Sequence, residues 1–177
     1  MKKILLNILF VTTILFIYYL QSNFFNWFTI AGVMPNIYIL FVLFIGLFTN
    51  KYTSLIYGAI VGTIIDSLFG QIIGINMFAY ILVAILALVF DKNFSKDSRA
   101  TIIVMVIAAT LIYEIVSIVI SYVILQINID VWIFIKTLCI ETIFNVILTI
   151  IIYPMFQNIG SIVENEYKGS QVLTRYF

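Results

Sequence analysis

The sequence predicts an all-α membrane protein with six transmembrane helices, and three observations carry this prediction. First, 64% of the 177 residues are apolar and the mean hydropathy is +1.19, whereas a soluble domain is about 45–50% apolar. Second, a bilayer core of about 30 Å needs about 20 apolar residues per helix. The chain therefore has room for about five to seven spans in a single integral membrane domain, residues 1–177. Third, its basic residues are distributed unevenly between the two sides of a six-span arrangement.

The first span is expected at residues 4–20. Lys2 and Lys3 precede it, and no small-x-small cleavage site follows, so we interpret it as a permanent helix rather than a signal peptide. The next segment, residues 21–34, has no basic residue. It is typical of an aromatic belt at the membrane interface because it contains Phe24, Phe25, Trp27 and Phe28.

The second, third and fourth spans are expected at 35–49, 52–69 and 77–90. Pro35 opens the second span, since proline fits the first turn of a helix. The second and fourth runs have about 14 to 15 residues, below the usual range of about 17 to 25. Local thinning of the bilayer, or burial behind other helices, is needed to accommodate them.

The fifth and sixth spans are expected at 100–125 and 131–153, with Pro154 marking the end of the last helix. Residues 157–177 are expected to form a cytoplasmic tail, in part as a short interfacial helix. With both termini cytoplasmic, eight of the nine basic residues fall inside and Lys136 falls toward the outside. This positive-inside bias supports six spans over five, and it places Trp27 and Trp132 at the outer interface.

The composition excludes several kinds of site. The chain has no histidine and a single cysteine, Cys139, so neither a His-based metal site, nor a His-based catalytic triad, nor a disulfide framework can be built from it. The net charge of +1, without a basic cluster, argues against nucleic acid as a partner. We expect no cofactor and no metal.

Small and acidic residues recur every four positions along the third span and the turn after it. They are Gly58, Gly62, Asp66, Gly70 and Gly74, and steps of four keep side chains near one face of a helix. Glycines at this spacing let another helix approach closely. A carboxylate in apolar surroundings must face the protein interior, find a partner or become protonated, which makes Asp66 a functional-site candidate. The plainer interpretation, favoured for the glycines alone, is that they pack helices together and that the aspartate caps one.

Glu114 and Glu141 are expected at the same depth on the fifth and sixth spans, near the middle of the membrane. Each lies on a polar stripe at helical spacing, and Asn145 belongs to the second stripe. Lys136, on the same span as Glu141, is expected to belong to the same polar region. If the stripes face each other, they form a polar cavity that opens outward, in which at least one carboxyl group is protonated or paired. Alternatively, the hydroxyl groups and the asparagine hold the helices together by hydrogen bonds.

Asp66 and Lys136 also lie at similar depths, about 6 Å and 7.5 Å below the outer ends of their helices. They are candidates for an ion pair between the third and sixth spans. The alternative is that Lys136 extends to the outer headgroups.

The glycine and aspartate run, preceded by Met34, Pro35 and Asn36, resembles the MreD family of rod shape-determining proteins. The chain departs from the common family pattern at Ile64 and Ile65, where leucines usually stand. The resemblance implies a non-enzymatic multi-pass subunit of the bacterial cytoplasmic membrane that works in the cell-elongation complex and in lateral peptidoglycan synthesis. It implies MreC as a direct partner, and MreB, RodA and a penicillin-binding protein as further partners. It also implies a fold similar to the substrate-binding subunits of energy-coupling-factor transporters.

The leading hypothesis is thus a scaffold for cell-shape regulation. In it, the face with Gly58 and Gly62 docks an MreC helix or a second copy of the chain in a homodimer. Asp66 either stabilises the turn before the fourth span or sets the geometry in which the partner helix docks. A leucine at position 62 is then expected to abolish association with MreC without affecting membrane insertion.

Two other hypotheses remain. One is a vitamin-like substrate-binding subunit of a membrane transporter, with Glu114, Glu141 and Asn145 lining the site. The other is an intramembrane enzyme, for which the carboxyl pair at 114 and 141 is the suitable candidate in the absence of histidine.

Overall fold

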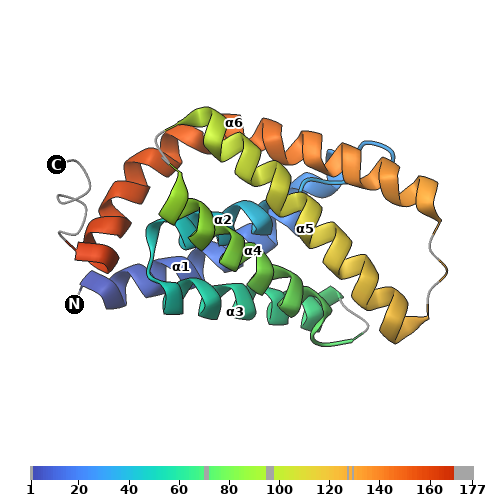
Figure 1. Cartoon of the computed structure of the whole chain (residues 1–177), viewed down its shortest axis with the longest axis horizontal. Coiled ribbons are helices and arrows are strands. Elements are labelled where there is room, and N and C mark those ends of the chain that lie inside the picture. Colours follow the sequence, from blue (N-terminus) through green and yellow to red (C-terminus); the bar gives the residue numbers. More distant parts are fainter. Residues whose placement is uncertain (1, 70–71, 95–97, 127, 129, 170–177) are drawn as a thin grey trace.

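The computed structural model describes residues 2–69, 72–94, 98–126, 128 and 130–169. Within these residues the chain is helical, and β-type pairing is limited to an isolated bridge between Ile30 and Val33. The all-α prediction is confirmed for this part of the chain. The α-helices, shown in Figure 1, are α1 (Lys2–Tyr19), α2 (Ile37–Phe48), α3 (Lys51–Phe69), α4 (Ile75–Asn93), α5 (Arg99–Leu125) and α6 (Val131–Lys168).

Five of the helical segments are long and apolar enough to cross a membrane, and α2 is not. With 12 residues, α2 is about 18 Å long, against about 30 Å for a bilayer core. The expectation of six full spans is therefore corrected to five candidate spans and one short helix. Burial behind other helices explains how the short helix is accommodated, since every residue of α2 is buried.

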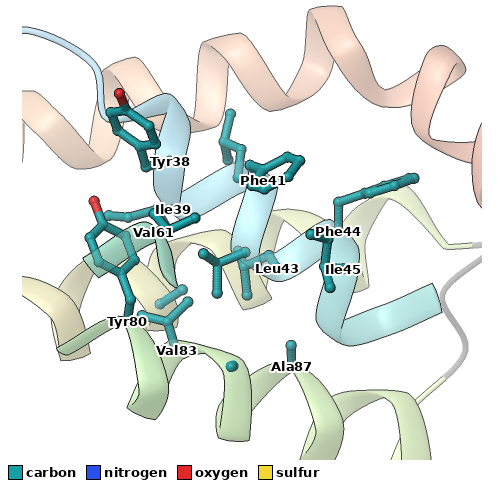
Figure 2. Packing of buried hydrophobic residues seen from close by; sticks show 14 of the residues in the cluster. Tyr38, Ile39, Phe41, Leu43, Phe44, Ile45, Val61, Tyr80, Val83 and Ala87 are labelled. Atoms are coloured by element: carbon teal, nitrogen blue, oxygen red, sulfur yellow. The ribbon is translucent and has the colours of Figure 1, made fainter. Parts of the chain in front are cut away.

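Helix α2 is the centre of the hydrophobic core. It contacts α3, α4, α5 and α6, and it is apolar on all sides, as a helix surrounded by protein must be. Figure 2 shows side chains of α2, among them Phe41, Leu43 and Ile45, packed with Val83 and Ala87 of α4. The other helices thus wrap around α2, and the residues at its two ends are held within the bundle.

The first span runs further than the expected residues 4–20. Helix α1 continues as a π-helical turn, η1 (Leu20–Phe24), and a 3-10 turn, η2 (Phe25–Trp27). A tight turn follows, in which Ala31 and Gly32 have positive φ angles of 53° and 81°. This turn reverses the chain and leads it back to Pro35 at the start of α2.

The expectation that Pro154 ends the last helix is wrong, because α6 continues through it to Lys168. Residues 157–168 are therefore the last turns of α6 rather than a separate tail, and residues 170–177 lie outside the described part. Proline removes one backbone hydrogen bond and favours a kink, and Figure 1 shows α6 bending along its course. Packing stabilises the continued helix: a Cβ atom added at Gly160 would lie 2.4 Å from the ring of Phe48.

Charged side chains join α6 to α1, α2 and α4 at one end of the bundle, which we call the terminal end. The Lys168 ammonium donates to the carbonyl oxygen of Leu47, at 2.6 Å, and to the Asp91 carboxylate, at 2.7 Å. Lys2 forms an ion pair with Glu166 at 3.4 Å. A cation at the last carbonyls of α2 also complements the helix dipole.

Replacing Lys168 by methionine is expected to lower the free energy of unfolding by about 1–2 kcal/mol. The Lys168 and Asp91 side chains are only 17% and 14% exposed, so water replaces the lost ammonium poorly. Denaturant unfolding in detergent measures the effect, and Lys92→Met, at an exposed position of the same end, is the matched control. Equal stability of the two variants would contradict the role given to Lys168.

Candidate functional site

A cavity of about 410 Å³ opens where α2 begins, at the end of the core remote from Lys168. Its walls come from η1 and η2, the start of α2, and helices α3 to α6. The lining includes Ser22, Asn36, Tyr38, Phe69, Tyr80, Tyr113, Glu114 and Glu141.

Glu114 and Glu141 both line this cavity. The structure thus brings together the two carboxyl groups whose equal depth was predicted from helix rise. Glu141 is 6% exposed, and its Oε1 atom makes no hydrogen bond with any described residue. Glu114 is half-buried. Two acidic side chains in an apolar bundle therefore share one cavity.

Asn145 is buried behind the cavity and links three helices. Its Oδ1 accepts a hydrogen bond from the backbone N–H of Asn36 at 2.8 Å, and its Nδ2 donates to Thr110 Oγ1 at 3.0 Å. It thus holds the start of α2 against α5 and α6, as in the interpretation that polar side chains of the stripes join helices. Asn145 is not among the residues that line this cavity, and its place in a ligand site stays a prediction.

The Asp66 carboxylate lies at the N-terminus of α4, where it accepts four hydrogen bonds. Oδ2 accepts from the backbone N–H groups of Gly74, at 2.7 Å, and Met77, at 3.1 Å. Oδ1 accepts from the backbone N–H and the side-chain amide of Asn76, at 3.0 and 2.9 Å. A carboxylate that binds the free N–H groups at a helix N-terminus stabilises both the turn and the helix.

The expected ion pair between Asp66 and Lys136 is not formed between these two described residues. Lys136 is exposed on α6, whereas Asp66 is 2% exposed. The carboxylate takes its partners from the N-terminus of α4, so it needs no cation. Lys136 is also absent from the cavity lining.

Two tyrosines extend the polar contacts across the bundle. Tyr113 donates to Asn76 Oδ1 at 2.6 Å, and Tyr80 donates to Asn36 Oδ1 at 3.0 Å. Their rings lie 4.7 Å apart. Since Asn76 binds Asp66 and Asn36 binds Asn145, polar contacts run from α3 to α6 beneath the cavity.

Sequence reasoning missed Asn76, Tyr80 and Tyr113. Two signals were available. Asn76 and Tyr80 are four residues apart and therefore share a face of one helix, and Tyr113 directly precedes Glu114 in the sequence. Both signals are weak, because tyrosines in membrane helices are also common at the interface.

The glycine face of α3 is covered by α4 of the same chain. A Cβ atom added at Gly62 would lie 2.3 Å from Met77 Cα, and one at Gly58 would lie 3.0 Å from the Tyr80 carbonyl oxygen. The expectation that this face docks a partner helix or a second copy is corrected, since α4 already occupies it. Gly74 has a φ of +122° in the turn before α4, and Gly70 lies outside the described residues.

The described residues contain no group of three or more His, Cys, Asp or Glu side chains that could hold a metal ion.

A family model described as "MreD: rod shape-determining protein MreD" matches residues 1–159 of the chain. No curated protein and no solved structure matches the chain. The expected likeness to the substrate-binding subunits of energy-coupling-factor transporters therefore stays a prediction.

Proposed function

Because the chain belongs to the MreD family of rod shape-determining proteins, we propose that it is a non-enzymatic scaffold subunit of the bacterial cell-elongation complex. The match over residues 1–159 is the observation that carries this proposal. In this role the protein binds MreC directly in the cytoplasmic membrane. It helps to organise MreB, RodA and a penicillin-binding protein for lateral peptidoglycan synthesis.

The proposed orientation places the terminal end of the bundle in the cytoplasm. The shared location of Lys2 and Lys168 at that end supports it, since basic residues favour the cytoplasmic side. The cavity then opens toward the outer face. Trp27 and Trp132, which are 86% and 82% exposed, are suited to the headgroup region of that face.

The outer parts of α5 and α6 are the surface that we propose for MreC. Buried residues of α5 end at Tyr113, and those of α6 begin at Glu141. The described residues between them are half-buried or exposed, and Figure 1 shows the two helices diverging there. Half-buried Ser117 and Thr137 lie among exposed apolar side chains in these segments, and such hydroxyl groups promote helix association in membranes.

Photo-crosslinking tests this proposal. Crosslinkers placed at Val119 on α5 and Ile133 on α6, both exposed, are expected to capture MreC in native membranes. The matched controls are Ile85 and Val89 on α4, which are also exposed and apolar. We expect at least a tenfold higher yield from the first pair. Equal yields at all four positions, or no crosslink to MreC, would overturn the proposed surface.

The alternative function, a substrate-binding subunit of a transporter, is favoured by the cavity of about 410 Å³, a size typical of small-molecule sites. A transporter subunit is expected to co-purify with a cytoplasmic ATPase. Co-purification with MreC and without an ATPase would support the scaffold instead.

A further inference from the structure

Three residues that line the cavity each have a buried oxygen atom with no hydrogen-bond partner among the described residues. These atoms are Ser22 Oγ, Tyr38 OH and Glu141 Oε1. Most buried polar atoms in proteins are paired, and each exception needs an explanation. Tyr38 is 3% exposed, and Figure 2 shows its hydroxyl group pointing in the same direction as that of Tyr80, away from the apolar side chains of α2. Three residues of the cavity lining thus each carry a buried oxygen atom without a hydrogen-bond partner.

The charges of the lining indicate the kind of ligand. Glu114 and Glu141 line the cavity, and no lysine or arginine does so among the described residues. An anion would meet two acidic groups without a compensating cation. A cation would instead offset the cost of placing carboxylates in an apolar bundle.

The remaining walls suit an organic cation rather than a metal ion. Phe69, Tyr80 and Tyr113 are among the residues that line the cavity, and the face of an aromatic ring attracts an ammonium group. The volume of about 410 Å³ exceeds what a bare ion needs and lies within the range of small-molecule sites, about 300–1,000 Å³.

We propose that the cavity at the start of α2 binds an organic molecule through a primary ammonium group, with Glu141 as its main acceptor. An ammonium group has three N–H donors, which match the carboxylate of Glu141 and the hydroxyl oxygens of Tyr38 and Ser22. The ammonium group belongs either to a soluble amine or to the headgroup of an amino lipid. This proposal does not depend on the scaffold role.

The test uses the full chain in nanodiscs of phosphatidylglycerol, titrated with ethanolamine. We expect a saturable rise of about 5 °C in the unfolding temperature at high occupancy. Ethylene glycol, a molecule of similar size without the charge, is expected to produce none. An equal rise with ethylene glycol, or no rise with ethanolamine, would overturn the proposal.

Two variants test the residues. Glu141→Gln keeps the shape of the side chain and is expected to weaken ethanolamine binding at least tenfold, whereas Glu166→Gln at the terminal end leaves it unchanged. Tyr38→Phe removes a buried hydroxyl group without a partner, so the fold should tolerate it. It should still weaken binding several-fold. Wild-type affinity in both Glu141→Gln and Tyr38→Phe would refute the assignment.

The source of the amine is tested by adding phosphatidylethanolamine to the nanodiscs and measuring bound lipid by native mass spectrometry. If the lipid is the ligand, it stays bound to the wild type and is lost from Glu141→Gln. If a soluble amine is the ligand, ethanolamine raises the unfolding temperature equally in both kinds of nanodisc. Either result supports an ammonium site. If the lipid does not stay bound and ethanolamine does not raise the unfolding temperature, the proposal is overturned.

Discussion

Replacing Gly62 by alanine is expected to destabilise the protein by about 3 kcal/mol, because the added Cβ atom would meet backbone. It would lie 2.3 Å from Met77 Cα and 2.7 Å from the Asn76 carbonyl oxygen. Backbone atoms at a helix N-terminus cannot move aside without disturbing the contacts that Asp66 makes there. A shift of α4 away from α3 is the expected consequence.

Gly58→Ala is the matched comparison on the same helix face. Its Cβ atom would lie 3.0 Å from the Tyr80 carbonyl oxygen and 3.2 Å from Ala84 Cβ, so a smaller loss of about 1 kcal/mol is expected. Exposed Ile56, changed to alanine, serves as the control with little effect. Unfolding by denaturant in detergent gives the three values. Wild-type stability of Gly62→Ala would show that α4 does not pack on this face.

The same geometry changes the expected result of Gly62→Leu. Loss of association with MreC in that variant would follow from disrupted packing of α3 against α4 within the chain. It would not identify a docking surface. The folded fraction therefore has to be measured together with the association.

Replacing Asp66 by alanine is expected to lower the free energy of unfolding by about 3–5 kcal/mol. The change removes the acceptor of four part-buried hydrogen bonds. A donor left without a partner costs about 1–3 kcal/mol when it is buried, and less where water replaces the acceptor. Asp66→Asn keeps one oxygen and is expected to fall between alanine and the wild type. Thermal unfolding in nanodiscs measures the series.

Asp130 provides the control for this second prediction. It caps α6 by accepting from the N–H groups of Trp132 and Ile133, at 3.0 and 3.2 Å, but it is exposed to solvent. Asp130→Ala is expected to cost about 1 kcal/mol, as is usual for an exposed N-cap. If Asp66→Ala and Asp130→Ala lower the free energy of unfolding equally, burial does not make the Asp66 contacts more stabilising than those of an exposed cap.

Local patterns were sufficient for several features of the site. Helix rise placed Glu114 and Glu141 at the same depth, and both line the cavity. The four-residue steps identified Gly58, Gly62 and Asp66 as one face of α3, which the structure shows buried against α4. These predictions depend on the rise and the periodicity of a single helix, which its own backbone hydrogen bonds determine.

The sequence by itself determined that this is an all-α membrane protein, because its apolar content and the lengths of its apolar runs exceed those of soluble domains. Tertiary structure alone decided that α4 covers the glycines, that α2 lies inside the bundle and that α6 continues through Pro154. In a lipid solvent a helix is apolar toward lipid and toward protein alike, so hydrophobicity does not distinguish the two faces. Close packing of particular residues, such as the Phe48 ring against the backbone of Gly160, makes that distinction.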